Sequence, residues 1–185
     1  MTEKAKRGAT YDDVIAAPDD RIAEVVSGDL YLSPRPSLRH ANATSLLAAD
    51  LVEAFQRGRR GPGGWWIWFE PELHLTGDVL VPDIAGWRRE RLAAVPDGTG
   101  IELAPDWLCE VLSPGTERFD RMQKLPRYAI AGVGHLWLLD PMHRRLAIYG
   151  RLAQGWQLLE QHSGDAVVSA PPFEEVSIEL GPLWG

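Results

Sequence analysis

Cysteine and long apolar runs are nearly absent from this sequence. Only one of the 185 residues is cysteine, which excludes an internal disulfide and a zinc site built from cysteines. No apolar run approaches the roughly 18 residues needed to span a bilayer, and the stretch MTEKAKRGATYDD has no signal-peptide pattern. We therefore expect a cytoplasmic protein, in which Cys109 belongs to the core.

Positive charge is also scarce. The chain has 19 Lys and Arg residues against 26 Asp and Glu residues, a formal net charge of -7. This balance argues against a general nucleic-acid coat, because such binding depends on neutralising phosphates. The basic residues are clustered, which fits either local positive surfaces or ordinary solvated faces. Twelve of them lie in four groups: Arg57, Arg59 and Arg60; Arg88, Arg89 and Arg91; Arg118, Arg121, Lys124 and Arg127; Arg144 and Arg145.

Length and apolar patterning predict a single domain over residues 1–185 with mixed α+β structure. Helices are expected over TYDDVIAA, over residues 37–57, and over residues 117–131, where Pro126 should kink or restart the helix. Strands dominate the middle and end, so we expect one mixed central sheet flanked by helices, with extra strands near both ends. The strand-like runs are RIAEVV, LYLSP, WWIWFEPELHL, VLVPDIAGW, WLCEVL, HLWLLD, RLAIYG, WQLLEQ and AVVSA.

The run WLCEVL contains a glutamate, Glu110, within an otherwise apolar strand. Side chains alternate along a strand, so Glu110 shares one face with Leu108 and Leu112. An ionised carboxylate in such a place costs several kcal/mol unless it is paired. The sequence therefore predicts a partner for Glu110 elsewhere in the chain.

A second acid, Asp83, interrupts the apolar run VLVPDIAGW. A Pro-Asp pair alone is equally well explained as a turn cap. If the two acid-bearing strands are neighbours, however, both carboxylates converge and require a proton or a cation between them. Oxygen ligands of this kind select Mg²⁺ or Mn²⁺ and point to phosphoryl chemistry.

The segment DRMQKLPRY offers a cation for the same site. Asp120, Lys124 and Tyr128 are spaced at four and eight residues, so a helix places them on one face. Lys124 would steady the attacking water or the developing charge. The alternative, a surface Asp-Lys pair, is common and, for the spacing of these two residues taken alone, is the better explanation.

Several motifs together resemble the Uma-type family of restriction endonucleases, a branch of the PD-(D/E)XK nuclease superfamily. They are VPD, CEVLSPGT, D-x-x-x-K-x-P-x-Y, A-x-A-G-V and LWLLDP, with a similar N-terminal stretch from Glu24 through GDLYLSPRP to His40. The resemblance implies a restriction-endonuclease-like fold that hydrolyses DNA. It also implies that Asp83 and Glu110 bind Mg²⁺ or Mn²⁺, and that the catalytic lysine has moved from the position of Leu112 to Lys124.

Further residues and partners are expected around this core set. His40 and Glu72 are candidates for contacts behind the metal ligands or for a further metal contact, and Asp120 and Tyr128 for contacts behind the ligands. A homodimer is expected, since WWIWF is apolar on both faces and could form an interface. The alternative function is a catalytically silent homodimer of the same fold that binds DNA or protein; the intact acid, acid and lysine set favours the enzyme.

Overall fold

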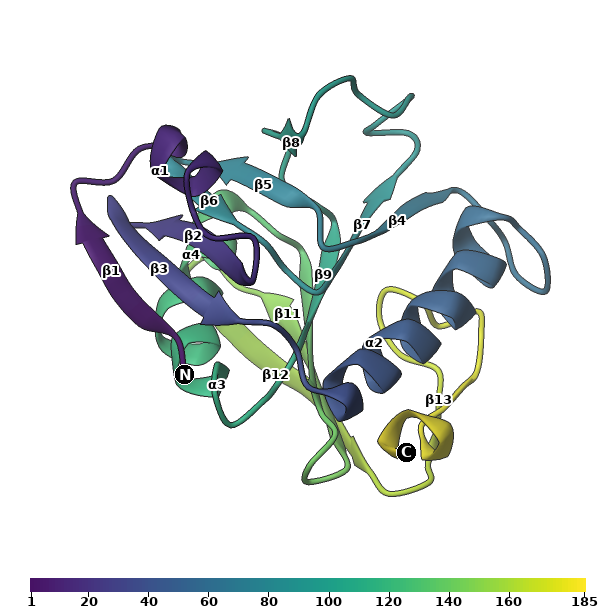
Figure 1. The fold of residues 1–185 in the computed structure, drawn as a ribbon. Helices are drawn as coiled ribbons and strands as arrows, with labels where there is room; N and C mark the ends of the chain where they lie inside the picture. The colour runs from purple at the N-terminus through teal and green to yellow at the C-terminus, as the bar shows by residue number, and fades with distance from the viewer.

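Two mixed sheets form the body of the molecule, and few helices accompany them (Figure 1). The computed structural model describes residues 1–185. The mixed α+β class expected from the sequence is confirmed. None of the helices combines the length and the apolar character needed to cross a membrane.

The first sheet has the strand order β1-β3-β2-β6-β5-β8 and is antiparallel except between β5 and β8. The expected hairpin of β2 and β3 lies within it, and the short helix α1 (Tyr11–Ile15) precedes β2. Strand β1 was not expected, because its sequence EKAKR is fully exposed and has no apolar alternation. The strands are β1 (Glu3–Arg7), β2 (Arg21–Val26), β3 (Asp29–Pro34), β5 (Glu72–Leu75), β6 (Asp78–Leu80) and β8 (Gly100–Ile101).

The second sheet has the order β12-β11-β10-β9-β7-β4, and only β9 and β10 are parallel. A helical crossover joins these two strands, as parallel pairs require. It consists of α3 (Glu117–Phe119), the π-helical turn η2 (Asp120–Lys124) and α4 (Leu125–Ala131), so the helix restarts next to Pro126 as expected. The strands are β4 (Trp65–Phe69), β7 (Ile84–Arg88), β9 (Trp107–Val111), β10 (His135–Asp140), β11 (Arg145–Arg151) and β12 (Trp156–Ser163).

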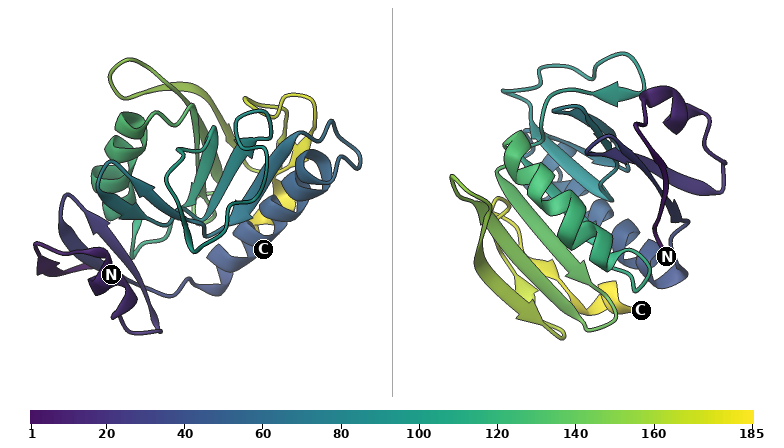
Figure 2. Two further views of the ribbon diagram at one scale, coloured as in Figure 1. Left: turned by 90° about the horizontal axis from the view of Figure 1, so that it is seen from above. Right: turned by 90° about the vertical axis from the view of Figure 1, so that its left-hand side faces the viewer.

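Different elements cover the two faces of the second sheet (Figure 2). Helix α2 (Leu38–Leu51) with η1 (Val52–Gln56) packs on one face, together with the C-terminal elements β13 (Val167–Val168), β14 (Ile178–Glu179) and η3 (Gly181–Trp184). Helix α4 and the inner strands of the first sheet pack on the other. Trp107, Cys109 and Val111 pack into the core on the α2 side of this sheet, and Leu108 and Leu112 pack into the core on the α4 side. The predicted alternation of side chains along this strand is confirmed.

Two expected strands are each divided between the sheets. The run WWIWFEPELHL forms β4 and β5, and VLVPDIAGW forms β6 and β7, so the prediction of two unbroken strands is wrong. The breaks lie side by side, because the Glu70 N–H donates to the Asp83 carbonyl at 3.0 Å. Glu70 has a φ of 44°, outside any strand conformation, and Pro82 has no N–H for a ladder. The chain therefore passes between the sheets at Asp83.

Candidate active site

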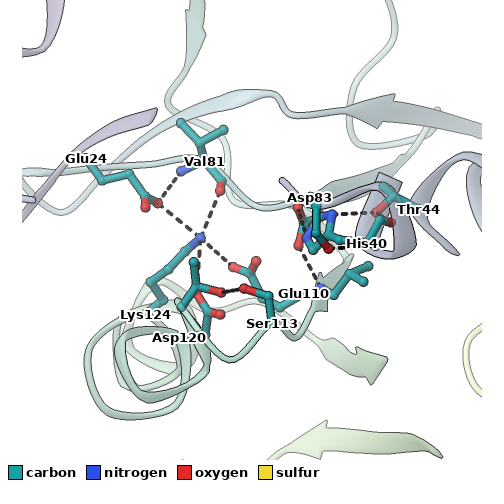
Figure 3. A network of polar contacts seen from close by, with 12 residues as sticks. Glu24, His40, Thr44, Val81, Asp83, Glu110, Ser113, Asp120 and Lys124 are labelled. Carbon is teal, nitrogen blue, oxygen red and sulfur yellow. Dashed lines mark hydrogen bonds and ion pairs between the residues drawn. The ribbon is translucent and has the colours of Figure 1, made fainter. Parts of the chain in front are cut away.

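A cavity of about 240 Å³ opens where the chain crosses between the two sheets. Its walls are the segments 33–37, which link β3 to α2, and 113–116, which follow β9. Figure 3 shows the polar network in this region. The charged and titratable side chains that line the cavity come from six parts of the chain: Glu24, Arg35, His40, Asp83, Glu110, Asp120 and Lys124.

Glu110 finds its partners in the helical crossover. The hydroxyl of Tyr128 donates to Oε1 of Glu110 at 2.7 Å, and Nζ of Lys124 lies 2.9 Å from the same oxygen. Both contacts involve Oε1, and Glu110 lines the cavity. The carboxylate is thus anchored through one oxygen, and the lone pairs of the other are not used by these contacts.

Lys124 is buried, with 3% of its surface exposed. Its ammonium donates to the Val81 carbonyl at 2.9 Å and lies 3.1 Å from Oε1 of Glu24. Asp120, one turn earlier in η2, is 3.9 Å away. The interpretation of Asp120 and Lys124 as a surface pair is therefore wrong, since both side chains are buried and face Glu110.

Asp83 is held by both of its oxygens. Oδ2 accepts the N–H of Val111 at 2.7 Å, which ties Asp83 to the strand that carries Glu110. Oδ1 lies 3.0 Å from Nε2 of His40. Each carboxylate oxygen has two lone pairs, so both bonds leave capacity for a further ligand.

His40, in the first turn of α2, faces hydrogen-bond acceptors through both ring nitrogens. Nδ1 lies 3.3 Å from Oγ1 of Thr44, whose hydroxyl donates to the His40 carbonyl at 2.9 Å. Burial lowers the pKa of His40, but the hydrogen bond to Asp83 and the charge of that carboxylate outweigh burial and raise it. The His40 ring therefore orients Asp83 from the side of α2.

The buried charges around Lys124 are unbalanced. Three carboxylates, those of Glu24, Glu110 and Asp120, lie within 4 Å of one ammonium. Burial raises the pKa of Glu110 well above its ordinary value, and burial raises that of Asp120 to about 7. Burial lowers the pKa of Lys124, but the charges of Glu110 and Glu24 outweigh burial and raise this pKa well above its ordinary value. The cluster thus has an excess of negative charge, which a proton or a cation would relieve.

The donor set fits a hard divalent cation with few protein ligands. No group of three or more His, Cys, Asp or Glu side chains is arranged to hold a metal ion. Asp83 lies directly before β7 and Glu110 lies in the neighbouring strand β9, and both carboxylates line one cavity. Mg²⁺ is usually held by one or two carboxylates, with waters and substrate phosphate completing its shell. A zinc site, with four protein ligands of N and S type, does not fit.

The other residues expected at the site divide into two groups. His40 and Asp120 line the cavity, and Tyr128 lies behind Glu110. Glu72 does not line the cavity; it accepts a hydrogen bond from His74 at 2.7 Å. Glu24 was missed, although it is an acid within the apolar strand run RIAEVV, the same signal that identified Glu110.

Comparisons with known proteins agree with this fold. A family model described as "Uma2: Putative restriction endonuclease" matches residues 9–181. The chain is similar to a crystal structure described as a putative nuclease belonging to DUF820, from Anabaena variabilis ATCC 29413. The two have a TM-score of 0.73 at 21% identity, over 95% of this chain and 97% of that chain. No curated protein matched the sequence. The match over nearly the whole chain confirms the resemblance noted in the sequence: the chain belongs to the Uma2 family of putative restriction endonucleases.

Proposed function

We propose that this protein is a metal-dependent endonuclease that hydrolyses phosphodiester bonds in DNA. The observation that carries the proposal is the convergence of Asp83, Glu110 and Lys124 on one cavity. Fold alone is a weak guide to function, since one fold hosts many activities. Two carboxylates and an ammonium at a polar cavity, in a family described as restriction endonucleases, support phosphodiester hydrolysis.

Asp83 and Glu110, with a backbone carbonyl near Val111, would hold Mg²⁺ or Mn²⁺. Such an ion, when bound, supplies a Lewis acid that activates water and offsets the charge of the phosphate. The protein fixes the geometry before the ion arrives. Val111 and His40 hold Asp83 from two sides, and Tyr128 and Lys124 hold one oxygen of Glu110.

Lys124 is the catalytic cation of the proposal. A lysine has three donors, and in this structure they are directed to Glu110, Glu24 and the Val81 carbonyl. A small movement of the ammonium towards the cavity exchanges one of these partners for the attacking water or a phosphate oxygen. Because the site is partly shielded from solvent, this charge acts more strongly than it would in water.

The walls of the cavity offer groups suited to a phosphodiester backbone. Ser33, Ser113 and Thr116 contribute hydroxyls, and Arg35 contributes a guanidinium. Arginine and hydroxyl groups are common partners of phosphate oxygens, and such contacts position the strand without reading its bases. Arg35 would thus place a positive charge beside the phosphate, while the excess negative charge of the carboxylates would be offset by the bound cation.

Metal-dependent cleavage of single-stranded, duplex and branched DNA tests the proposal. The wild type should cut at least one form with Mg²⁺ or Mn²⁺, should not cut it with excess chelator, and should lose the activity on Asp83→Asn. Glu53→Gln, at a half-buried acid of η1 that does not line the cavity, is the matched control and should cut normally. If no DNA form is cut at high enzyme concentration with either ion, the proposal fails and a catalytically silent module is favoured.

A further inference from the structure

Glu24 is a buried acid that the proposed mechanism does not use. It lies in β2, and 2% of its surface is exposed. Glu24 is distant in sequence from Asp83 and Glu110, and its side chain contacts Val81 and Lys124. A buried carboxylate is costly unless its partners compensate it, so these two contacts define what Glu24 does.

The three groups form a closed triangle, which Figure 3 shows. Oε1 of Glu24 accepts the Val81 N–H at 2.8 Å and lies 3.1 Å from Nζ of Lys124. The Val81 carbonyl accepts from Nζ of Lys124 at 2.9 Å. Each member therefore contacts the other two. The triangle connects the first sheet, the crossing segment before Asp83, and the helical turn η2.

The backbone explains why this side chain is needed. Strand β6 ends at Leu80 and Pro82 has no N–H, so the Val81 N–H lies beyond the strand ladder. A buried N–H without a partner costs free energy comparable to a lost hydrogen bond. Glu24 satisfies this donor, and the same oxygen then draws the ammonium of Lys124 to the crossing segment.

We infer that Glu24 is a positioning residue for Lys124. It holds the ammonium between Glu110 and the carbonyl of Val81, which is two residues before Asp83. Glu24 therefore sets the position of the cation relative to both proposed metal ligands. The inference rests on the proposed function in that Lys124 is the cation of the reaction. The position of Lys124 itself can be measured without any reaction.

Accessibility of Lys124 provides that independent measurement. The chain has three lysines, Lys4, Lys6 and Lys124, and the side chains of the first two are 39% and 52% exposed. Reaction with an amine-directed reagent, read by mass spectrometry, should modify Lys4 and Lys6 readily and Lys124 slowly. Glu24→Ala should raise the Lys124 rate about tenfold or more relative to the other two lysines, since its anchor is lost. Glu24→Gln keeps the oxygen that accepts the Val81 N–H and should stay close to the wild type.

Asp78→Asn is the matched control. Asp78 is another buried acid of the first sheet; it accepts the Ser27 N–H at 2.7 Å and lies 3.4 Å from Nε of Arg127 in α4, and it contacts neither Lys124 nor Val81. If Glu24 only stabilises the sheet, any variant with the same loss of thermal stability should show the same increase in the modification rate of Lys124, and Asp78→Asn should then behave like Glu24→Ala. The inference requires that Asp78→Asn leaves the Lys124 rate unchanged.

Cleavage and metal binding complete the test. With saturating Mn²⁺, Glu24→Ala should lower the single-turnover cleavage rate of the wild type about tenfold or more. In the Lys124→Ala background the same change should lower the rate by less than about twofold, because Glu24 acts through the Lys124 ammonium, which is then absent. Calorimetry with Mn²⁺ alone should give an unchanged dissociation constant, because Glu24 does not contact Asp83 or Glu110. Equal losses of rate in both backgrounds would overturn the inference.

The two proposals fail separately. If the wild type cuts no DNA, the proposed function fails, and selective exposure of Lys124 in Glu24→Ala still supports the positioning role. If Glu24→Ala folds and the reactivity of Lys124 does not change, the positioning role is overturned whether or not the wild type is active.

Discussion

Lys124 and Glu110 form a buried ion pair, with 2.9 Å between Nζ and Oε1 and with 4% and 2% of the two side chains exposed. The pair joins the π-helical turn η2 to strand β9. Removing one partner of such a pair leaves an uncompensated charge in the interior, at a cost of roughly 3–5 kcal/mol. The proposed catalytic groups are thus also part of the core, and every test of their chemistry must include a test of folding.

Lys124→Ala should lower the cleavage rate by on the order of a hundredfold, the usual scale for the loss of one preorganised donor. Leu112 follows Glu110 on the same strand face, so Leu112→Lys in the Lys124→Ala background should recover part of the rate. Single-turnover cleavage at saturating Mn²⁺ measures both effects. Circular dichroism and thermal melting must show that each variant is folded, because Leu112 is buried.

Arg121→Ala is the control for these variants. Arg121 lies in the same helical turn but pairs with Glu117 on the exposed side, so its loss should leave cleavage unchanged. A folded Lys124→Ala protein that cuts at the wild-type rate would show that Lys124 is structural. With Arg121 tested by this control, the catalytic cation would then be sought at Arg118 or Arg127.

Asp120→Asn should stabilise the protein more at pH 8 than at pH 5. Burial raises the pKa of Asp120 in the folded protein to about 7, from an ordinary value of 3.8. Between these values the folded state holds a proton that the unfolded state has lost, so the stability of the wild type falls as the pH rises from about 4 to about 7. Asparagine does not ionise, so the stability of the variant does not fall with pH through this group.

Urea denaturation in chelating buffer at pH 5 and pH 8 measures the effect. The difference in free energy of unfolding between Asp120→Asn and the wild type should grow in favour of the variant by roughly 2 kcal/mol over this range. Glu117→Gln, an exposed acid just before η2, is the control and should give no such trend. A difference that stays constant with pH would show that Asp120 is not protonated near neutral pH.

The candidate site was largely predictable, because buried acids in apolar strands are conspicuous in a sequence. Alternation in WLCEVL assigned Glu110 to its face, and the spacing of Asp120, Lys124 and Tyr128 placed them together. Glu24 gave the same signal in RIAEVV, but its contact is to the Val81 N–H, which lies outside the strand ladder, and no local pattern reveals that contact.

The division of the strands between two sheets was not predictable in the same way. The break before β5 depends on the backbone of Glu70, whose N–H bonds the Asp83 carbonyl across the crossing point. The positive φ of Glu70, next to Pro71 and opposite Pro82, interrupts the strand in spite of the strand preference of WWIWF. Glu72 was assigned to the site from its place on the hairpin partner of the Pro-Asp strand, but its side chain contacts His74 and does not line the cavity.

Self-association should be detectable by sedimentation at micromolar concentration. Strand β4 is the edge of the second sheet, and Phe69 at its end is 55% exposed. A symmetric pair of small nuclease domains would present one site to each strand of a duplex. We expect a homodimer, and we expect Phe69→Asp to shift it towards the monomer. A wild-type protein that is monomeric and still cuts both strands of a duplex would contradict this prediction.

Anomalous diffraction from crystals grown with Mn²⁺ tests the central claim most directly. The account predicts one manganese peak within roughly 2.5 Å of carboxylate oxygens of both Asp83 and Glu110, and no peak there in crystals of Asp83→Asn grown in the same way. Wild-type crystals with ordered Asp83 and Glu110 side chains and no manganese between them would contradict the account, as would an equal peak in Asp83→Asn.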